Sequence, residues 1–231
     1  MSPLLVALVG AAPSTARVVD TATNISFDAN PVVDGTPFVC LGAGLRKKAF
    51  FKVYAVSFCV EEEAARAHLD RWFATTGKRH GSLRGDKLAE ALQDDQALFQ
   101  TLMAMSADKL VEMVFVRDVS RDKIKSSFTD SLVQALGPRE KMRIAAFVEN
   151  LPRGVKSGEH ILMRGHVNGD ITVRLGDRQQ DLHDEVIAPA LWIAYLGPDS
   201  ITPTLKKAVA AGVARLRAQP RQAVSEKPAD E

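Results

Sequence analysis

The order of strand-like and helix-like segments constrains the fold of this chain more than any other feature. Unbroken apolar runs rich in Val, Phe and Tyr predict strands that are covered on both faces. These runs occupy residues 38–41, 50–60 and 110–116. A shorter extended segment at residues 24–27 precedes them, and Asp34-Gly35 is typical of a hairpin turn. The first half of the chain is therefore expected to contribute mainly strands.

Apolar residues at helical spacing occur between and after these runs. They predict helices over residues 64–74 and 86–105. The clearest helix begins at Ser120, whose hydroxyl can cap the free amides of the first turn, and it ends at Gly137. Its apolar face comprises Ile124, Phe128 and Leu132. A further helix is expected over residues 142–151.

A second hairpin and two more helices complete the pattern. Residues 160–167 and 171–175 flank Asn168-Gly169, which accepts the positive φ of a tight turn. The first closing helix carries Ile187, Leu191 and Tyr195 on its apolar face. The second starts at Thr202-Pro203, an N-cap followed by Pro at the first helical position, and buries Leu205, Val209 and Leu216. This order lacks the regular βαβ alternation of a doubly wound sheet. It indicates an α+β fold in which an antiparallel sheet is packed by helices.

Size and charge limit the classes of function. A chain of 231 residues that is 46% hydrophobic supports one sizeable core, which we place at residues 18–216. The net charge is +2 and basic residues are interspersed with acidic ones. A general nucleic-acid binder needs a basic face, so no nucleic-acid partner is expected. Residues 217–231 are rich in Pro, Lys, Glu and Asp and are expected to be a disordered tail.

The amino-terminal segment has two interpretations. Residues 3–12 (PLLVALVGAA) are apolar but only about half as long as a membrane span requires, so no stable membrane insertion is expected. Residues 14–16 (STA) resemble the cleavage site of a secretory signal, although no Lys or Arg precedes the apolar run. Residues 1–17 are therefore either a signal-peptide remnant, which implies a periplasmic or secreted protein, or a disordered segment of a cytoplasmic one.

Familiar catalytic and metal-binding patterns are missing from the sequence. Cys40 and Cys59 belong to no CxxC or Cys/His ligand pattern and the histidines are isolated, so neither a metal nor a cofactor is expected. Residues 42–44 (GAG) begin like a dinucleotide-binding loop, but Lys47 stands where the third glycine should be. Both cysteines lie in apolar runs and are interpreted as small buried hydrophobes. A disulfide between adjacent strands is the alternative if the chain is exported.

Residues 41–60 (LGAGLRKKAFFKVYAVSFCV) form the most unusual segment. Glycines within a strand mark a bulge or the close approach of a ligand or another backbone. An arginine that leads into an apolar strand must extend to solvent, pair with an anion or serve a site. Arg46 is therefore either a solvated edge residue or a binding group.

Arg46 and Tyr54 could act together only in one geometry. They are eight residues apart, which is roughly 26 Å along one straight strand. The two side chains therefore meet only if the chain folds back near Lys47-Lys48. Such a turn would place a fixed cation and a phenol at the head of an apolar slot, which suits a carboxylate or an enolate oxygen.

The same segment resembles the signature of the chalcone isomerase superfamily, in which a G-x-G-x-R stretch leads into a K-V-Y-A-like strand. Residues 115–123 (FVRDVSRDK) and 196–208 (LGPDSITPTLKKA) are similar to the bacterial chalcone-isomerase-like branch. The resemblance covers residues 24–211. It implies an open-faced β-sandwich with helices over one layer and a cleft between helices and sheet.

The resemblance also implies site residues. In the plant enzymes of the family, which cyclise chalcones, an arginine holds the substrate oxygen. In the fatty-acid-binding branch, the equivalent arginine grips the carboxylate together with a tyrosine. By motif, these residues are Arg46 and Tyr54. The isomerase has threonine in place of Tyr54, and its tyrosine and asparagine align near Ser120 and Ser127, so the departures favour binding over catalysis.

The leading hypothesis is non-catalytic binding of an amphipathic small molecule, a fatty acid or similar carboxylate, with its head group held by Arg46 and Tyr54. One alternative is an isomerase or intramolecular lyase acting on an enone-like, chalcone-like substrate, in which Arg46 would stabilise an oxyanion. Another is a non-catalytic structural or partner-binding protein whose cleft is filled by core side chains.

Two further residues are candidates for the cleft. Ser127 lies in the helix that begins at Ser120, and Arg117 follows an apolar strand. Arg117 could instead form a salt bridge to Asp118 or Asp122.

Overall fold

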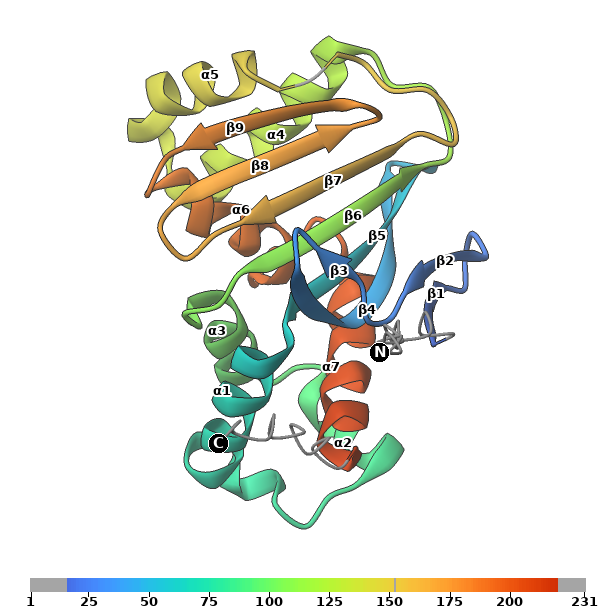
Figure 1. Ribbon diagram of the computed structural model, residues 1–231, viewed down its shortest axis with the longest axis vertical. Helices are drawn as coiled ribbons and strands as arrows, with labels where there is room; N and C mark the ends of the chain where they lie inside the picture. Colours follow the sequence, from blue (N-terminus) through green and yellow to red (C-terminus); the bar gives the residue numbers. More distant parts are fainter. Residues whose placement is uncertain (1–15, 152, 220–231) are drawn as a thin grey trace, which may run out of the picture.

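The computed structural model describes residues 16–151 and 153–219. Its main sheet is antiparallel and has the strand order β3-β4-β5-β6-β7-β8-β9, each strand pairing with the next in the chain (Figure 1). The strands are β3 (Val32–Val33), β4 (Thr36–Lys48), β5 (Phe51–Glu61), β6 (Lys109–Phe115), β7 (His160–Gly165), β8 (Asp170–Leu175) and β9 (Arg178–His183). A separate hairpin consists of β1 (Arg17–Asp20) and β2 (Ile25–Asp28).

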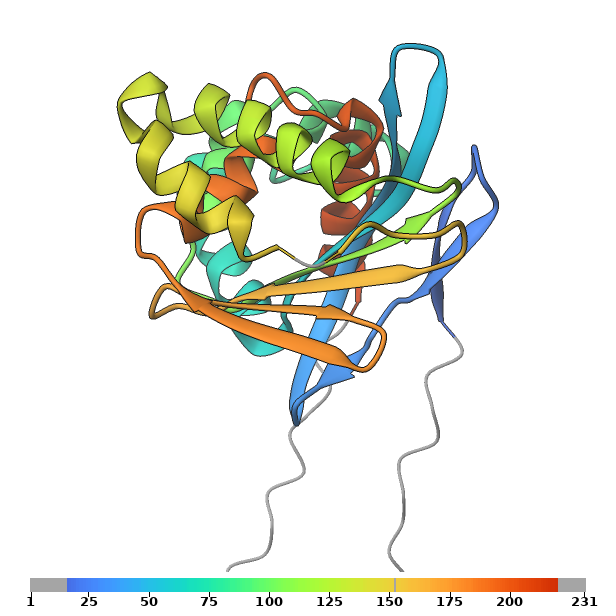
Figure 2. The ribbon, with the colours of Figure 1, turned by 90° about the horizontal axis from the view of Figure 1, so that it is seen from above.

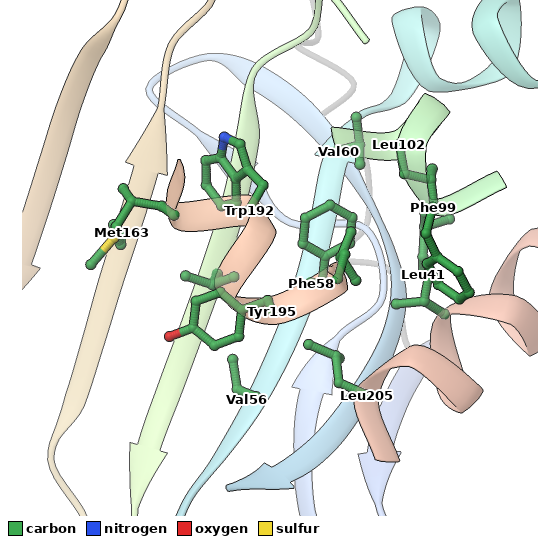
Figure 3. Close-up of a cluster of buried hydrophobic side chains, with 14 of the residues drawn as sticks. Leu41, Val56, Phe58, Val60, Phe99, Leu102, Met163, Trp192, Tyr195 and Leu205 are labelled. Carbon is green, nitrogen blue, oxygen red and sulfur yellow. The ribbon is translucent and has the colours of Figure 1, made fainter. Parts of the chain in front are cut away.

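Helices cover one face of this sheet, which curls beneath them (Figure 2). They are α1 (Glu62–Ala74), α2 (Gly85–Leu92), α3 (Gln96–Ala104), α4 (Arg121–Leu136), α5 (Lys141–Glu149), α6 (Ile187–Leu196) and α7 (Pro203–Ala218). The larger apolar core lies between them and the sheet, and Figure 3 shows Phe58 of β5 packed among Trp192 of α6, Leu205 of α7 and Leu102 of α3. These layers confirm the predicted α+β fold with helices over one side.

The β1–β2 hairpin packs on the other face of the sheet. Val18 of β1 and Phe27 of β2 are buried in a second, smaller cluster with Phe38 of β4 and Val114 of β6. The two clusters arise because successive side chains of a strand point to opposite faces. This second layer covers only part of the sheet, which is the open-faced arrangement expected from the family resemblance.

Both predicted hairpin turns are present. Asp34 and Gly35 join β3 to β4 with φ values of 50° and 76°. Gly169 has a φ of 88° in the turn between β7 and β8. Strand β9, with the polar sequence RQQDLH, was not predicted, because no apolar alternation distinguishes it from a loop.

Strand β4 continues seven residues beyond the predicted end at residue 41, as far as Lys48. Its glycines allow the backbone of α7 to lie directly on the strand. A Cβ added at Gly44 would come within 2.4 Å of the backbone of Leu205, and one added at Gly42 within 2.5 Å of the backbone of Ala208. Of the meanings that glycine in a strand can have, close approach of another backbone is therefore the one realised here.

The prediction of a single helix over residues 86–105 is wrong, because two helices occupy this range. Helix α2 ends at Leu92, and Asp95 begins α3 by accepting hydrogen bonds from the amides of Ala97 and Leu98. Asp95 also binds the side chains of Arg79 and His80. A carboxylate used in this way starts a new helix, even where apolar spacing continues through the break.

The predicted helix starts differ in how they are capped. The Ser120 hydroxyl accepts from the amide of Lys123 and caps α4, as expected. Thr202 occupies the N-cap position of α7, but its side chain forms no capping hydrogen bond and its buried hydroxyl has no partner. The predicted start of α7 is therefore confirmed, whereas the expected capping bond is not formed.

The interpretation of Cys40 and Cys59 as unbonded small hydrophobes is wrong. The two residues are directly paired in register on β4 and β5 and form a disulfide. Both are buried, at 1% exposure, on the sheet face that carries the β1–β2 hairpin. The alternative weighed from the sequence, a bridge between adjacent strands, is what the structure contains.

The structure describes only the inner ends of the two terminal segments, which the sequence analysis placed at residues 1–17 and 217–231. Helix α7 extends to Ala218, slightly past the predicted domain boundary at residue 216, and β1 begins at Arg17. The rest of the predicted signal or disordered segment, residues 1–15, and residues 220–231 of the predicted tail lie outside the described residues. Within residues 16–151 and 153–219, every helix is too short or too polar to cross a bilayer.

Candidate functional site

The β4–β5 hairpin brings Arg46 and Tyr54 together. The chain reverses at Ala49-Phe50, next to the predicted position, and Arg46 pairs in register with Tyr54. The register shifts immediately afterwards, between Arg46 and Lys47, which marks a β-bulge. Opposed residues of an antiparallel pair project from the same face, so both side chains reach the helix-covered side of the sheet.

A cleft of about 290 Å³ opens on that side, between the outer ends of β4, β5 and β6 and the beginning of α4. All four residues singled out from the sequence line it: Arg46, Tyr54, Arg117 and Ser127. Its apolar wall is formed by Phe51, Val53, Met113, Phe115, Val119, Ile124 and Phe128. The space beside Arg46 is thus open, which counts against a protein whose cleft is filled by its own core.

The charged residues of the cleft are mostly cations. Arg46, Lys48, Arg117 and Lys123 line it, against a single carboxylate, Asp118. Asp118 is engaged elsewhere, since it forms an ion pair with Lys156 and accepts from the amide of Ser157, and these contacts lower its pKa. The cleft therefore has an excess of positive charge that no lining carboxylate offsets.

Arg46 is held in place without being neutralised. One guanidinium nitrogen donates to the carbonyl of Ile201 at 2.7 Å, just before α7 begins. Within the part of the chain that the structure describes, no carboxylate forms an ion pair with Arg46. A half-buried cation with donors left over is positioned to meet an anion supplied from outside.

Tyr54 and Tyr195, the only tyrosines in the sequence, meet beside Arg46. Burial raises the pKa of both phenols, while the hydroxyl of Tyr195 and the charge of Arg46 partly oppose this at Tyr54. The Tyr195 hydroxyl also donates to the sulfur of Met113 at 3.4 Å. At neutral pH both tyrosines are therefore uncharged hydrogen-bond donors.

Tyr195 is a site residue that the sequence reasoning assigned only to a helix core. Its ring does pack in the core, with the hydroxyl at the edge of the cluster (Figure 3). The sequence signal that could have indicated a role for Tyr195 is that the hydroxyl of a buried tyrosine needs a hydrogen-bond partner.

Arg117 lies at the outer side of the cleft. Its guanidinium sits 4.8 Å from the centre of the Phe51 ring, a cation–π contact. Arg117 forms no salt bridge with either Asp118 or Asp122, the partners considered from the sequence, and Asp118 pairs with Lys156 instead. Arg117 is therefore a cleft residue, stacked on the aromatic side chain at the end of β5.

Ser127 and Ser120 have different positions. Ser127 lines the cleft and also a small inner cavity of about 20 Å³ behind Tyr54, which Tyr195 and Ser131 line as well. The Ser120 hydroxyl is used to cap α4. The polar groups near the head of the cleft are thus two phenols and a serine around one arginine.

This arrangement, an antiparallel sheet with helices over one face and a cleft at their edge, defines the protein as an open-faced α+β sandwich. The sequence profile of the family described as chalcone isomerase like matches residues 36–210. The chain therefore belongs to the chalcone isomerase like family. No curated protein matches its sequence.

A solved structure with the same fold is that of a fatty-acid binding protein from Arabidopsis thaliana. The two chains superpose with a TM-score of 0.68, over 87% of this chain and 98% of the plant protein, at 16% sequence identity. At this identity the likeness establishes the shared fold and not a shared ligand.

Proposed function

We propose that the protein binds an amphipathic carboxylic acid, a fatty acid or a close analogue, without transforming it. The carboxylate lies at Arg46 and Tyr54, and the hydrocarbon tail lies along the apolar wall of the cleft. The observation that carries this proposal is the half-buried Arg46, which donates to Ile201 and has no carboxylate partner among the described residues. The fold shared with a plant fatty-acid binding protein is consistent with it.

The surroundings of Arg46 favour an acid over a neutral ligand. Four cations and one already paired carboxylate line the cleft, so a negative head group gains attraction along the entry path. Tyr54 remains protonated at neutral pH and lines the cleft, so it can offer a hydrogen bond to the head group, whereas Tyr195 stands behind it with its hydroxyl donated to Met113. The apolar wall then removes the tail from water.

The size of the cleft limits the ligand. Its volume of about 290 Å³ is at the lower end of the range found for small-molecule sites. A medium-length chain fits inside, whereas a longer one extends out of the mouth past Phe51. We therefore expect saturated acids of medium length to bind best.

Binding of dodecanoate and its methyl ester, measured by isothermal titration calorimetry, tests the assignment. Arg46→Gln is expected to weaken dodecanoate binding about ten- to a hundredfold, since a hydrogen bond to a charged group contributes about 1.5–3 kcal/mol. The methyl ester should lose much less affinity, because its uncharged carbonyl oxygen accepts a weaker hydrogen bond than a carboxylate does. An unchanged dodecanoate affinity in Arg46→Gln would refute the site.

Arg215→Gln is the matched control. Arg215 also donates to a backbone carbonyl, that of Cys40 at 3.3 Å, but it lies on α7 at the opposite end of β4. Its replacement removes the same charge from the protein and should leave dodecanoate binding unchanged. Equal losses in both variants would indicate a general charge effect and contradict a specific role for Arg46.

We further propose that the protein works in an oxidising compartment, the periplasm or the cell exterior. The Cys40–Cys59 disulfide supports this location, since such bonds are rare in the cytosol. Alkylation of free thiols in cells lysed directly into denaturant, which exposes the buried Cys40 and Cys59, followed by mass spectrometry, tests the location. Unlabelled cysteines are expected, and labelled thiols would contradict it.

A further inference from the structure

The turn of the β4–β5 hairpin carries an exposed surface that extends beyond the cleft, since Lys47, Phe50 and Lys52 do not line it. Residues 46–52 (RKKAFFK) contain four cations, two phenylalanines and no acidic residue. We call residues 47–52 the hairpin tip. In Figure 2 the hairpin projects beyond the helices at the upper right, in light blue. The tip is therefore free to contact something outside the molecule.

The two phenylalanines of the tip are exposed to an unusual degree. Phe50 is 98% exposed and Phe51 is 61% exposed, whereas every other aromatic side chain of residues 16–151 and 153–219 is buried or half-buried. Ala49, which precedes them, has a φ of 52°, a conformation that favours glycine. The chain thus accepts backbone strain in the turn that presents an aromatic residue to solvent.

Cations surround these rings. Lys47, Lys48 and Lys52 are exposed, and none of them forms an ion pair with another described residue. Lys52 donates to the carbonyl of Ala22 at 2.6 Å, which holds it beside the tip. Arg117 stacks on Phe51. Exposed aromatic side chains flanked by lysines and arginines are typical of segments that bind at the surface of an anionic membrane.

The tip also forms part of the rim of the cleft. Lys48, Phe51 and Arg117 belong both to the surface around the tip and to the lining of the cleft. A membrane against the tip would therefore face the mouth through which a lipid-soluble acid enters. An anionic partner bound by charge alone would not require two exposed phenylalanines beside the lysines, whereas a membrane offers an apolar interior for them.

We propose that the hairpin tip docks on anionic phospholipid membranes, with Phe50 inserted among the lipids and Lys47, Lys48 and Lys52 at the head groups. The docked protein then exchanges its ligand directly with the bilayer. This use of the surface rests on the proposed function, but docking itself is measurable without any added ligand. It makes the membrane the source or the destination of the bound acid.

Co-sedimentation of the full chain with large vesicles tests the docking. The vesicles contain phosphatidylcholine alone, or phosphatidylcholine with about a third phosphatidylglycerol. We expect binding to the anionic vesicles, little to the neutral ones, and release as NaCl rises, because salt screens the attraction. Equal binding to both kinds, or none to either, would overturn the proposal.

The double variant Phe50→Ser/Lys47→Glu identifies the surface responsible. Neither residue lines the cleft, so ligand binding in solution is preserved. Binding to anionic vesicles is expected to fall at least tenfold. The matched control is Met142→Ser/Lys141→Glu on α5, which removes an 88% exposed apolar side chain and changes the net charge equally. A loss of the same size in the control would contradict the assignment to the tip.

Two further measurements distinguish docking from ligand binding and from self-association. Dodecanoate titration without vesicles reports the proposed function alone, so a protein that binds dodecanoate but not vesicles refutes only the docking. Vesicle binding without dodecanoate binding refutes only the proposed function. Sedimentation of the free protein detects self-association, and a dimer that Phe50→Ser dissociates would show that a second copy covers the tip and would overturn the membrane proposal.

Discussion

The two ends of the β4–β5 hairpin differ, although the same two strands form both. At the inner end, Cys40 and Cys59 are linked and α7 lies directly on Gly42 and Gly44. At the outer end, beyond Leu45, α7 has not yet begun and the strands border a cleft. The hairpin is structural where a helix covers it and available to a ligand where the helix stops.

The boundary between the two ends is set by the start of α7. The amide of Leu45 donates to the Thr204 hydroxyl, and the guanidinium of Arg46 donates to the carbonyl of Ile201. One residue farther out, the strand register shifts and the side chains become exposed. The end of a packing contact thus determines where the binding site begins.

Two cations beside β5 show the same difference. Lys109 of β6 pairs with Val60 near the inner end, is 5% exposed, and donates to the carbonyls of Met105 and Ala107. Arg46 at the outer end donates to one carbonyl and keeps its other donors for the cleft. The buried ammonium of Lys109 donates its hydrogen bonds to carbonyls of the protein, whereas the guanidinium of Arg46 keeps donors that a ligand can use.

The largest loss of stability is expected from adding a side chain where α7 lies directly on β4. A Cβ at Gly212 would lie 1.6 Å from the carbonyl oxygen of Leu41, so Gly212→Ala must push the helix off the strand. We expect the free energy of unfolding to fall by about 4 kcal/mol or more, measured by urea denaturation. Lys207→Ala on the exposed face of α7 is the control, with a change within about 0.5 kcal/mol. A Gly212→Ala protein of normal stability would show that α7 does not pack directly on β4 at the inner end.

The disulfide should matter for stability and not for binding. Its cysteines are 19 residues apart, a loop for which removal of the bridge costs about 3 kcal/mol. We expect Cys40→Ala/Cys59→Ala to lose roughly this amount in urea denaturation. Dodecanoate affinity should be unchanged under conditions where both proteins are folded. A loss of affinity with no loss of stability would reverse the roles assigned to the two ends.

Lys109 predicts a pH dependence of stability. Burial lowers the pKa of its amine from 10.5 to about 8, although the charge of Asp108 acts in the opposite direction. Between these two pH values the unfolded chain binds more protons than the folded one, so stability rises with pH. The rise amounts to up to about 3 kcal/mol, at about 1.4 kcal/mol for each pKa unit.

Denaturation of wild type and Lys109→Met between pH 7 and 10.5 measures this contribution as a difference. The rise attributed to Lys109 should be present in the wild type and missing from the variant. Parallel curves for the two proteins would mean that the amine is not enclosed at the inner end.

The smallest effect is expected at the outer end. Tyr54→Phe removes one neutral hydrogen bond to the head group, which contributes about 1 kcal/mol, or about fivefold in Kd. Titration calorimetry with dodecanoate measures the change, and the variant should retain its ring contact with Phe115. If Tyr54→Phe weakened binding as much as Arg46→Gln, the phenol and not the guanidinium would be the main contact.

Much of the fold could be predicted because its signals are local. Apolar runs marked β5 and β6, turn residues marked the hairpins at Asp34 and Gly169, and Ser120 marked the start of α4. Predictions failed where a long-range contact decided the outcome. The close approach that the glycines of β4 permit, for example, is made by α7, which lies more than 150 residues later in the chain.

The candidate site was predicted in part for the same reason. Arg46 and Tyr54 belong to one hairpin, so a local reversal was enough to bring them together. Tyr195 comes from α6, far along the chain, and only packing places its hydroxyl beside Tyr54. A prediction from the sequence found the hairpin's own residues and missed the one contributed by a distant helix.

The sequence by itself determined the residue types of the site and the hairpin that carries them, because turn and strand preferences act between near neighbours. Only the tertiary structure decided that Arg46 would lack a carboxylate partner among residues 16–151 and 153–219 and that the cysteines would be linked. The register of β4 against β5 places Cys40 opposite Cys59, and the segment before α7 places the Ile201 carbonyl beside Arg46, so both outcomes depend on how separate segments come within a few ångströms of each other.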